Sequence, residues 1–191
     1  MSEMPKHTTK DRALEAYLVA AAKTGDRVAC DRLARLVTPR LLAHAARLLG
    51  EVEPARDAVQ SAWVEILVAL PRLRAVEAFR SFALQIVTRR VARMIRGRQR
   101  DRLIGAEVAL EVEGSTAPLG EIAADAASVR RAVDALPPLH RATLALFYLE
   151  EMSVAEVATA LDVPVGTVKT RLMHARAKLR EILKGDQDEQ D

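Results

Sequence analysis

The residues best suited to binding chemistry are the cations of the stretch VPVGTVKTRLMHARAKL, which runs from Val163 to Leu179. No acidic residue lies between Thr167 and Arg180, so no neighbouring carboxylate in the sequence neutralises these cations. Lys and Arg side chains gathered in this way favour a phosphate-rich partner, because they bind phosphates and release the surrounding counterions. The stretch is therefore a candidate nucleic-acid surface.

Two helices with a tight turn would hold these cations in place. Ser153 and Glu156 form the pattern of a capping box at the start of a short helix. The pair Asp162-Val163 supplies the turn, and Pro164 suits the first turn of a second helix. The second helix has one apolar stripe, which is made by Val168, Leu172, Ala175, Leu179 and Ile182.

The basic residues lie off this stripe. At about 100° per residue, Lys169, Thr170, Met173 and His174 point away from it, and Arg171, Arg176 and Lys178 lie on its flanks. A short helix, a tight turn and a longer basic helix are typical of a DNA-binding helix-turn-helix, whose second helix lies in the major groove. The alternative is an ordinary helical hairpin with a solvated basic face; the all-positive exposed surface favours DNA binding.

A second basic segment follows a predicted helix from Phe79 to Arg96. Seven arginines occur between residues 89 and 102, and Asp101 is the only acid among them. Gln85, Arg89, Arg93 and Arg96 face outward on this helix, and we expect a polyanion there as well. The alternative is a solvated helix end, where cations also suit the helix dipole.

Composition and charge divide the chain into two all-α domains. Of the 191 residues 50% are hydrophobic and only 3% aromatic, and the net charge is +3. We expect helical domains at residues 12–96 and 129–184, an acidic tail at 185–191, and a new helix beginning at Pro39. Residues 97–128, with no Lys or Arg between Gly105 and Ser128, are expected to form a flexible acidic linker, or alternatively a loop partly ordered on one domain.

The sequence lacks the residue patterns that metal binding, catalysis and membrane insertion require. Cys30 is the only cysteine and the four histidines are scattered, so we expect no metal site and no cofactor. The sequence has no phosphate loop and no nucleophile paired with a base, so we expect no enzyme and no catalytic residue. The N-terminal residues lack the apolar core of a signal peptide and no apolar run could span a bilayer, which predicts a cytoplasmic protein without membrane insertion.

Two stretches resemble the extracytoplasmic-function (ECF) sigma factors of bacterial RNA polymerase. Val163–Leu179 is similar to the P-x-G-T-V-K-S-R-L-x-R-A-R motif of that family, and Asp57-Ala58-Val59-Gln60 resembles its D-x-V-Q motif. The resemblance implies a region 2 bundle followed by a region 4 helix-turn-helix. It also implies a sigma factor that binds core RNA polymerase and promoter DNA and is held inactive by an anti-sigma factor.

The resemblance implies a role for three sets of residues. The first set would contact the clamp coiled coil of the polymerase and comprises Asp57, Gln60 and Ser61. The second would hold the melted −10 element and comprises Phe82, Gln85, Arg89, Arg93 and Arg96. The third would contact the −35 element, while its domain meets the polymerase flap, and comprises Thr167, Lys169, Thr170, Arg171, Met173, His174, Arg176 and Lys178.

One rival function uses the same helix-turn-helix. A stand-alone transcription regulator would bind DNA without joining the polymerase. The outward set at Asp57 and Gln60, on a helix next to a basic one, argues against this rival, because a plain regulator has no use for it.

Overall fold

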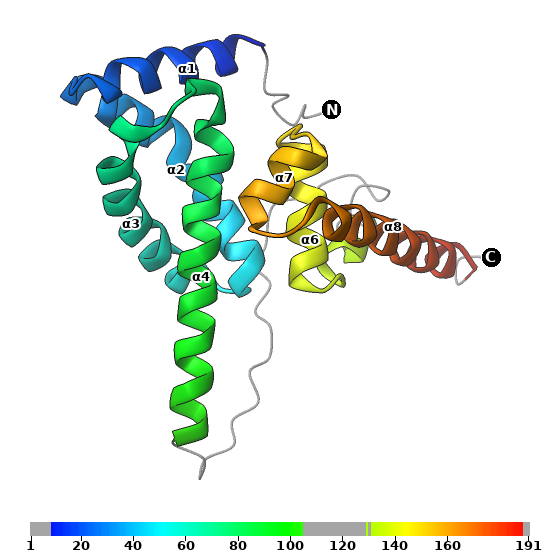
Figure 1. Ribbon diagram of the computed structural model, residues 1–191. Helices are drawn as coiled ribbons and strands as arrows, with labels where there is room; N and C mark the ends of the chain where they lie inside the picture. Colours follow the sequence, from blue (N-terminus) through cyan, green and yellow to red (C-terminus); the bar gives the residue numbers. More distant parts are fainter. Residues whose placement is uncertain (1–8, 105–128, 130, 189–191) are drawn as a thin grey trace.

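The computed structural model describes residues 9–104, 129 and 131–188; these residues form helices joined by turns and short connecting segments, with no strand among them. The helices gather into an N-terminal group, α1 to α4, and a C-terminal group, α6 to α8 (Figure 1). This confirms the predicted fold class of two helical domains. Most of the expected linker, residues 105–128, and the last three residues of the acidic tail lie outside the described residues.

The first domain is a bundle in which α2, α3 and α4 pack side by side beneath α1. Local signals set its helix ends. The Asp26 carboxylate accepts hydrogen bonds from the backbone N–H groups of Val28 and Ala29, and Gly50 ends the same helix with a left-handed φ of 79°. Its elements are α1 (Thr9–Lys23), α2 (Arg27–Leu49), α3 (Val52–Ala69), η1 (Leu70–Arg72), η2 (Val76–Ala78) and α4 (Phe79–Ile104).

The prediction that a new helix begins at Pro39 is wrong, because α2 is one continuous helix with Pro39 inside it. Proline removes one backbone donor from a helix interior. Buried residues on both sides of it, Val37 and Leu41, hold α2 against the rest of the bundle. Tertiary packing therefore outweighs the local cost of the proline.

Helix α4 extends beyond the expected end of the first domain. It runs on to Ile104, so the boundary expected at residue 96 lies inside a helix. In Figure 1 the second half of α4 projects below the rest of the bundle. The arginines at 96, 98 and 100 are exposed on this projecting part.

The second domain contains the predicted pair of helices. After a helical stretch at 131–134 come α6 (Pro138–Leu144), the π-helical segment η3 (Ala145–Leu149), α7 (Val154–Leu161) and α8 (Val165–Asp188). Helix α8 takes in residues 185–188, so the first part of the expected tail belongs to this helix.

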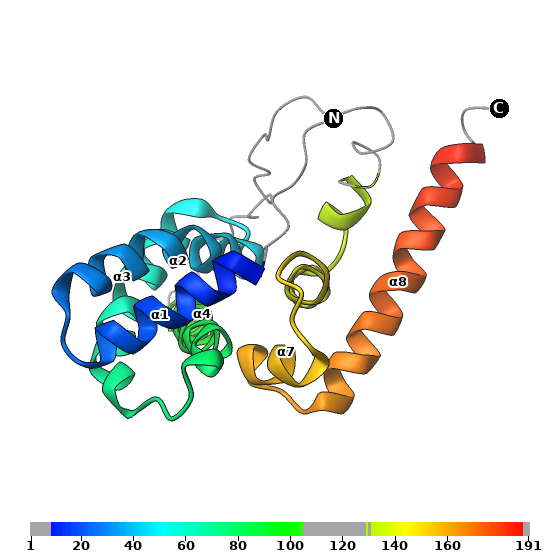
Figure 2. The same cartoon turned by 90° about the horizontal axis from the view of Figure 1, so that it is seen from above.

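The two domains pack against each other through a shared apolar core. Buried residues of the second domain, including Leu146 and Leu161, join the same cluster as Leu41 and Val87 of the first. Contacts between α4 and α7 and between α2 and α6 make this junction. Figure 2 shows α7 beside α4, while α8 leads away from the first domain.

Candidate nucleic-acid interface

The turn between α7 and α8 has the geometry that its residues predict. The Ser153 hydroxyl accepts a hydrogen bond from the Glu156 N–H, and the Glu156 carboxylate accepts one from the Ser153 N–H. These two bonds complete the capping box and lower the pKa of Glu156 against the opposing effect of burial. Asp162 then ends α7 in a left-handed conformation, with φ of 56°. Helix α8 begins directly after Pro164.

The outer surface of α8, which we call the α8 face, is the third set of residues predicted above. Its buried counterpart is the stripe of Val168, Leu172 and Ala175. Six of the eight predicted residues are exposed: Lys169, Thr170, Met173, His174, Arg176 and Lys178. Thr167 and Arg171 are half-buried. The helix therefore presents most of the predicted set together on one side.

Arg171 differs from the other cations of the α8 face. Burial lowers its pKa, and its Nη1 atom is buried without a hydrogen-bond partner in the protein. His140 of α6 is close enough for Arg171 and His174 to lower the pKa of His140, in addition to the larger effect of burial. The His140 and His174 rings lie 6.3 Å apart.

Arg176 is held in place by aromatic residues that sequence reasoning missed. Its Nε–H donates to the Tyr148 hydroxyl at 2.9 Å, and its guanidinium lies 5.5 Å from the centre of the Tyr148 ring and 5.9 Å from that of Phe147. The two rings meet edge to face. Tyr148 belongs to η3, 28 residues before Arg176, so no local spacing points to this pair.

The second predicted set, which we call the α4 face, is only partly open. Arg96 is exposed, but Phe82 is half-buried and packs against Phe79 with ring centres 6.4 Å apart. Gln85 and Arg89 both bind Asp162 of the second domain. A groove of about 390 Å³ lies between α4 and this turn, and is lined by Thr88, Arg89, Ala92, Arg93, Arg96, Leu161 and Asp162.

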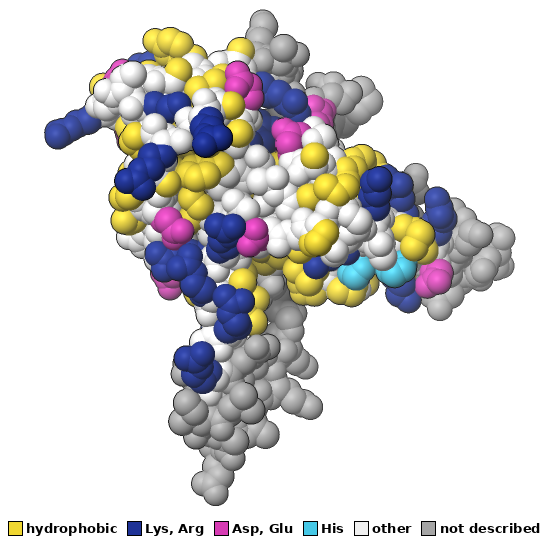
Figure 3. Space-filling model, viewed as in Figure 1, with side chains coloured by type: hydrophobic (Ala, Val, Ile, Leu, Met, Phe, Trp, Pro, Cys, Tyr) yellow, Lys and Arg dark blue, Asp and Glu magenta, His cyan; other side chains and the backbone are white. Residues whose placement is uncertain are grey.

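Acids from other elements neutralise arginines that have few acidic neighbours in the sequence. Glu65 of α3 pairs with Arg90 and Arg93, at 3.9 and 3.3 Å, and Glu51 pairs with Arg98 at 3.5 Å. Figure 3 shows Lys and Arg side chains along the lower part of α4 and on α8, with acidic side chains of other elements beside those on α4. Part of the arginine run is therefore neutralised by acids that lie outside it in the sequence.

A chain of hydrogen bonds crosses the junction of the domains. The Thr88 hydroxyl donates to the Ala160 carbonyl at 2.7 Å, so the His44 Nε2–H must be the donor to Thr88, at 2.9 Å. Ala160 needs this partner because it lies in the last turn of α7 and the residue four positions on is a proline. The His44 Nδ1 atom is buried without a partner, and burial with the charge of Arg47 lowers the pKa of His44 to about 3.

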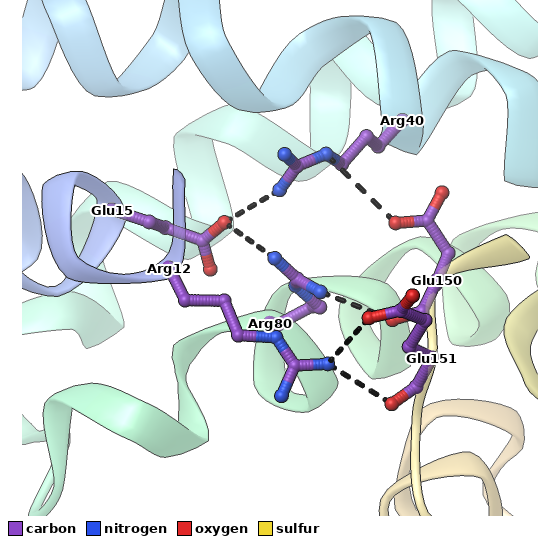
Figure 4. A network of polar contacts seen from close by, with 6 residues as sticks. All are labelled: Arg12, Glu15, Arg40, Arg80, Glu150 and Glu151. Atoms are coloured by element: carbon purple, nitrogen blue, oxygen red, sulfur yellow. Dashed lines mark hydrogen bonds and ion pairs between the residues drawn. The ribbon is translucent and has the colours of Figure 1, made fainter. Parts of the chain in front are cut away.

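A second polar group joins the domains at the far end of α7 (Figure 4). Glu15 of α1 lies between two arginines, with its Oε2 atom 2.6 Å from Arg40 Nη1 and 3.2 Å from Arg80 Nη2. Arg40 also pairs with Glu150 at 3.8 Å, and Arg80 donates to the Glu150 carbonyl at 3.2 Å. The Glu15, Arg40 and Arg80 side chains are only 9 to 12% exposed, so loss of one partner would leave a buried charge.

The first predicted set lies on α3, and we call it the α3 face. Asp57 and Gln60 are exposed and Ser61 is half-buried. The same side of the helix also exposes Val64 and Val68, 66% and 73% respectively, which sequence reasoning did not assign to this set. Residues spaced by three or four along a helix share a side, so the polar set continues into an apolar strip.

The described part of the chain contains neither a candidate metal site nor a candidate membrane-spanning helix. No group of three or more His, Cys, Asp and Glu residues in residues 9–104 and 131–188 could hold a metal ion. None of the described helices is both long and apolar enough to cross a membrane.

The fold and the α8 face together define a class: a two-domain helical protein with a C-terminal DNA-binding helix-turn-helix. Residues 33–101 match the family model "Sigma-70 region 2" and residues 126–179 match "Sigma-70, region 4". The chain is 32% identical over 170 residues to the ECF RNA polymerase sigma factor SigM of Mycobacterium tuberculosis, covering 88% of this chain and 84% of that protein. It is 28% identical over 179 residues to SigW of Bacillus subtilis, covering 87% and 95%. The chain belongs to the ECF RNA polymerase sigma factor family.

Two solved structures share this fold. The sigma factor RpoE from Bartonella quintana, crystallised with the anti-sigma factor NepR, superposes with a TM-score of 0.67 at 23% identity over 81% of this chain and 96% of that one. CnrH, in complex with the cytosolic domain of CnrY, gives a TM-score of 0.60 at 26% identity over 91% and 99%.

Proposed function

We propose that this sigma factor reads double-stranded −35 DNA with the α8 face. The observation that carries the proposal is a row of exposed polar and basic side chains on the second helix of a helix-turn-helix, where a recognition helix meets base edges and phosphates. In this role Thr170, Met173 and His174 face bases. Arg171 is half-buried beside these residues and suits a phosphate, because the forked donors of a guanidinium match phosphate oxygens.

The α4 face serves the −10 element in the same proposal. The arginines that extend along α4 from Arg89 to Arg100 would follow the phosphates of the separated strand, and Gln85 would meet an unstacked base. Unpairing a base costs a few kcal/mol. Tethering to the polymerase offsets this cost by raising the local concentration of protein at the promoter.

The α3 face is the proposed site for core RNA polymerase. Asp57 and Gln60 supply polar contacts to the clamp coiled coil, and the exposed Val64 and Val68 supply apolar area beside them. The second domain would rest on the polymerase flap. The protein acts in the cytoplasm, takes no cofactor and catalyses no reaction of its own.

An anti-sigma factor is the proposed inhibitor. Both structural relatives described above were solved with a partner of the sigma factor, and RpoE with an anti-sigma factor by name. An inhibitor that covers the surface on α3, α4 or α8 would block one of the proposed contacts.

Run-off transcription with core polymerase and a genomic promoter pool tests the proposal. We expect promoter-specific transcripts that are lost with Asp57→Ala/Gln60→Ala. The matched control is Asp31→Ala, an exposed acid on α2 that pairs with Arg35, and it should transcribe normally. A protein that binds DNA but never redirects initiation would be a stand-alone regulator, and the proposal would be wrong.

A further inference from the structure

Two acidic residues hold backbone conformations that usually belong to glycine. Glu151 and Asp162, with φ of 52° and 56°, are the non-glycine residues with positive φ within the described part of the chain. Residues with a side chain seldom adopt this region, and glutamate does so less readily than aspartate. Glu151 precedes α7 and Asp162 ends it. Backbone strain at both ends of one short helix points to a role beyond the turns themselves.

Both acids contact arginines of the other domain. Asp162 binds Arg89 at two points, with Nε to Oδ2 at 3.0 Å and Nη2 to Oδ1 at 3.1 Å, and also accepts a hydrogen bond from Gln85 at 2.9 Å. These hydrogen bonds raise the pKa of Arg89 and lower the pKa of Asp162. Glu151 accepts a hydrogen bond from Arg12 at its carbonyl, at 3.0 Å, and its carboxylate lies 3.8 Å from the same guanidinium. The two contacts are therefore ionic at opposite ends of α7.

The contact at Asp162 occupies the proposed DNA site. A forked guanidinium binds a carboxylate and a phosphate through the same donors. Arg89 can therefore hold Asp162 or a DNA phosphate, and Gln85 can meet Asp162 or a base. The partner of this surface in the free protein is the chain's own turn before the recognition helix.

We propose that Glu151 and Asp162 dock the second domain onto the first, so that the turn at Asp162 covers the α4 face until promoter or polymerase displaces it. This inference rests on the proposed function of the α4 face. The side chains of Arg89 and Asp162 are 51% and 45% exposed, so each contact is a partly solvated ion pair. Loss of one such pair lowers the ratio of closed to open protein by about two- to fivefold.

The test measures domain separation in the full chain. A donor and an acceptor dye are attached at Val28→Cys on α2 and Arg180→Cys on α8, both exposed positions, in a Cys30→Ser background. Asp162→Asn removes the charge and keeps a residue that tolerates positive φ. Glu151→Gln removes the charge at the other end and keeps the length of the side chain. Asp134→Asn is the matched control, because Asp134 pairs with Arg141 inside the second domain.

We expect energy transfer to fall in Asp162→Asn and Glu151→Gln, to fall further in the double variant, and to stay unchanged in Asp134→Asn. Asp162→Gly separates docking from turn geometry. Glycine relieves the strain of the positive φ, so the Asp162→Gly protein should have a higher melting temperature and unchanged energy transfer if Asp162 serves only the turn. If Asp162 also docks the domains, the energy transfer of this variant should fall. Unchanged energy transfer in the Asp162 variants would overturn the inference, whatever DNA binding shows.

Binding of a fluorescent 15-nucleotide single-stranded DNA of mixed sequence distinguishes this inference from the proposed function. If the closed form masks the α4 face, Asp162→Asn should bind the oligonucleotide about two- to fivefold more tightly, because more protein is competent to bind. Opening without any gain in binding supports docking and contradicts the −10 role of the α4 face. Equal binding and equal energy transfer contradict docking and leave the −10 role intact.

Discussion

Replacing Thr88 with valine tests the hydrogen-bond chain that links His44, Thr88 and Ala160. Valine has nearly the shape of threonine but can neither accept from His44 nor donate to Ala160. The His44 Nε2–H and the Ala160 carbonyl would then both lose their partner. His44 is 1% exposed, so water cannot easily replace the lost acceptor without local rearrangement.

The expected loss follows from the two bonds. Each intramolecular hydrogen bond contributes about 0.5–1.5 kcal/mol net, and a buried group left without a partner costs about 1–3 kcal/mol. The free energy of unfolding should therefore fall by about 2–4 kcal/mol. In a protein of this size that corresponds to roughly 4–16 °C in melting temperature.

Thermal unfolding followed by circular dichroism measures this loss, with Thr88→Ser as the control that keeps the hydroxyl. Serine should recover most of the stability that valine removes. The interdomain energy transfer should also fall in Thr88→Val, since one of its two bonds crosses the junction. A valine variant that melts within about 2 °C of the natural protein would refute the reasoning about His44 and Ala160.

Three further predictions concern a helix end, a buried histidine and the α8 face. Gly50→Ala should cost about 1 kcal/mol in urea unfolding, because φ is 79° there although no atom lies within 4 Å of the added Cβ. Gly166→Ala has equal space and no positive φ and lies in helix α8, so it should instead stabilise the protein by up to about 1 kcal/mol. Burial and Arg47 lower the pKa of His44 to about 3, so the unfolded chain binds the extra proton between pH 6.5 and 3. Stability should fall as the pH drops through this window, by about 2 kcal/mol at pH 5, and His44→Gln should flatten that slope in urea titrations. Tyr148→Phe removes the acceptor for Arg176 and should weaken −35 duplex binding about two- to fivefold in fluorescence anisotropy, whereas Tyr17→Phe on α1 should bind as the natural protein does.

Features that depend on neighbouring residues could be predicted from the sequence. The capping box at Ser153, the turn at Asp162 and the buried stripe of α8 each follow from residue types three or four positions apart. The exposed side of α8 can then be predicted too, because it consists of the residues that do not belong to the buried stripe. Arg171 departs from this pattern, since its burial depends on its surroundings in the folded domain rather than on the period of the helix.

Features that depend on distant contacts could not be predicted. Nothing near Arg89 in the sequence indicates that its guanidinium binds Asp162, which lies 73 residues later. The same holds for Glu65, which reaches two arginines of α4 from α3. Asp162 in the turn before α8 is a signal in the sequence, because glycine is usual at such a position. The sequence does not show which surface this turn contacts.

Tertiary packing, rather than local sequence, makes α2 one continuous helix. Pro39 predicts a break by local rules, because it cannot donate a hydrogen bond to the preceding turn. The buried faces before and after it belong to one core, and that core keeps the two halves in one helix. Local propensity loses here to the burial of apolar side chains.

The apolar core that runs from α2 and α4 into α6 and α7 makes domain separation sensitive to temperature. Parting the domains would hydrate aliphatic surface, and hydration of such surface carries a positive heat capacity change. Hydrophobic attraction weakens on cooling, whereas the ion pairs of the junction lack this dependence on aliphatic hydration. Chilling would therefore loosen the aliphatic share of the junction and leave its carboxylate–guanidinium contacts as the main restraint.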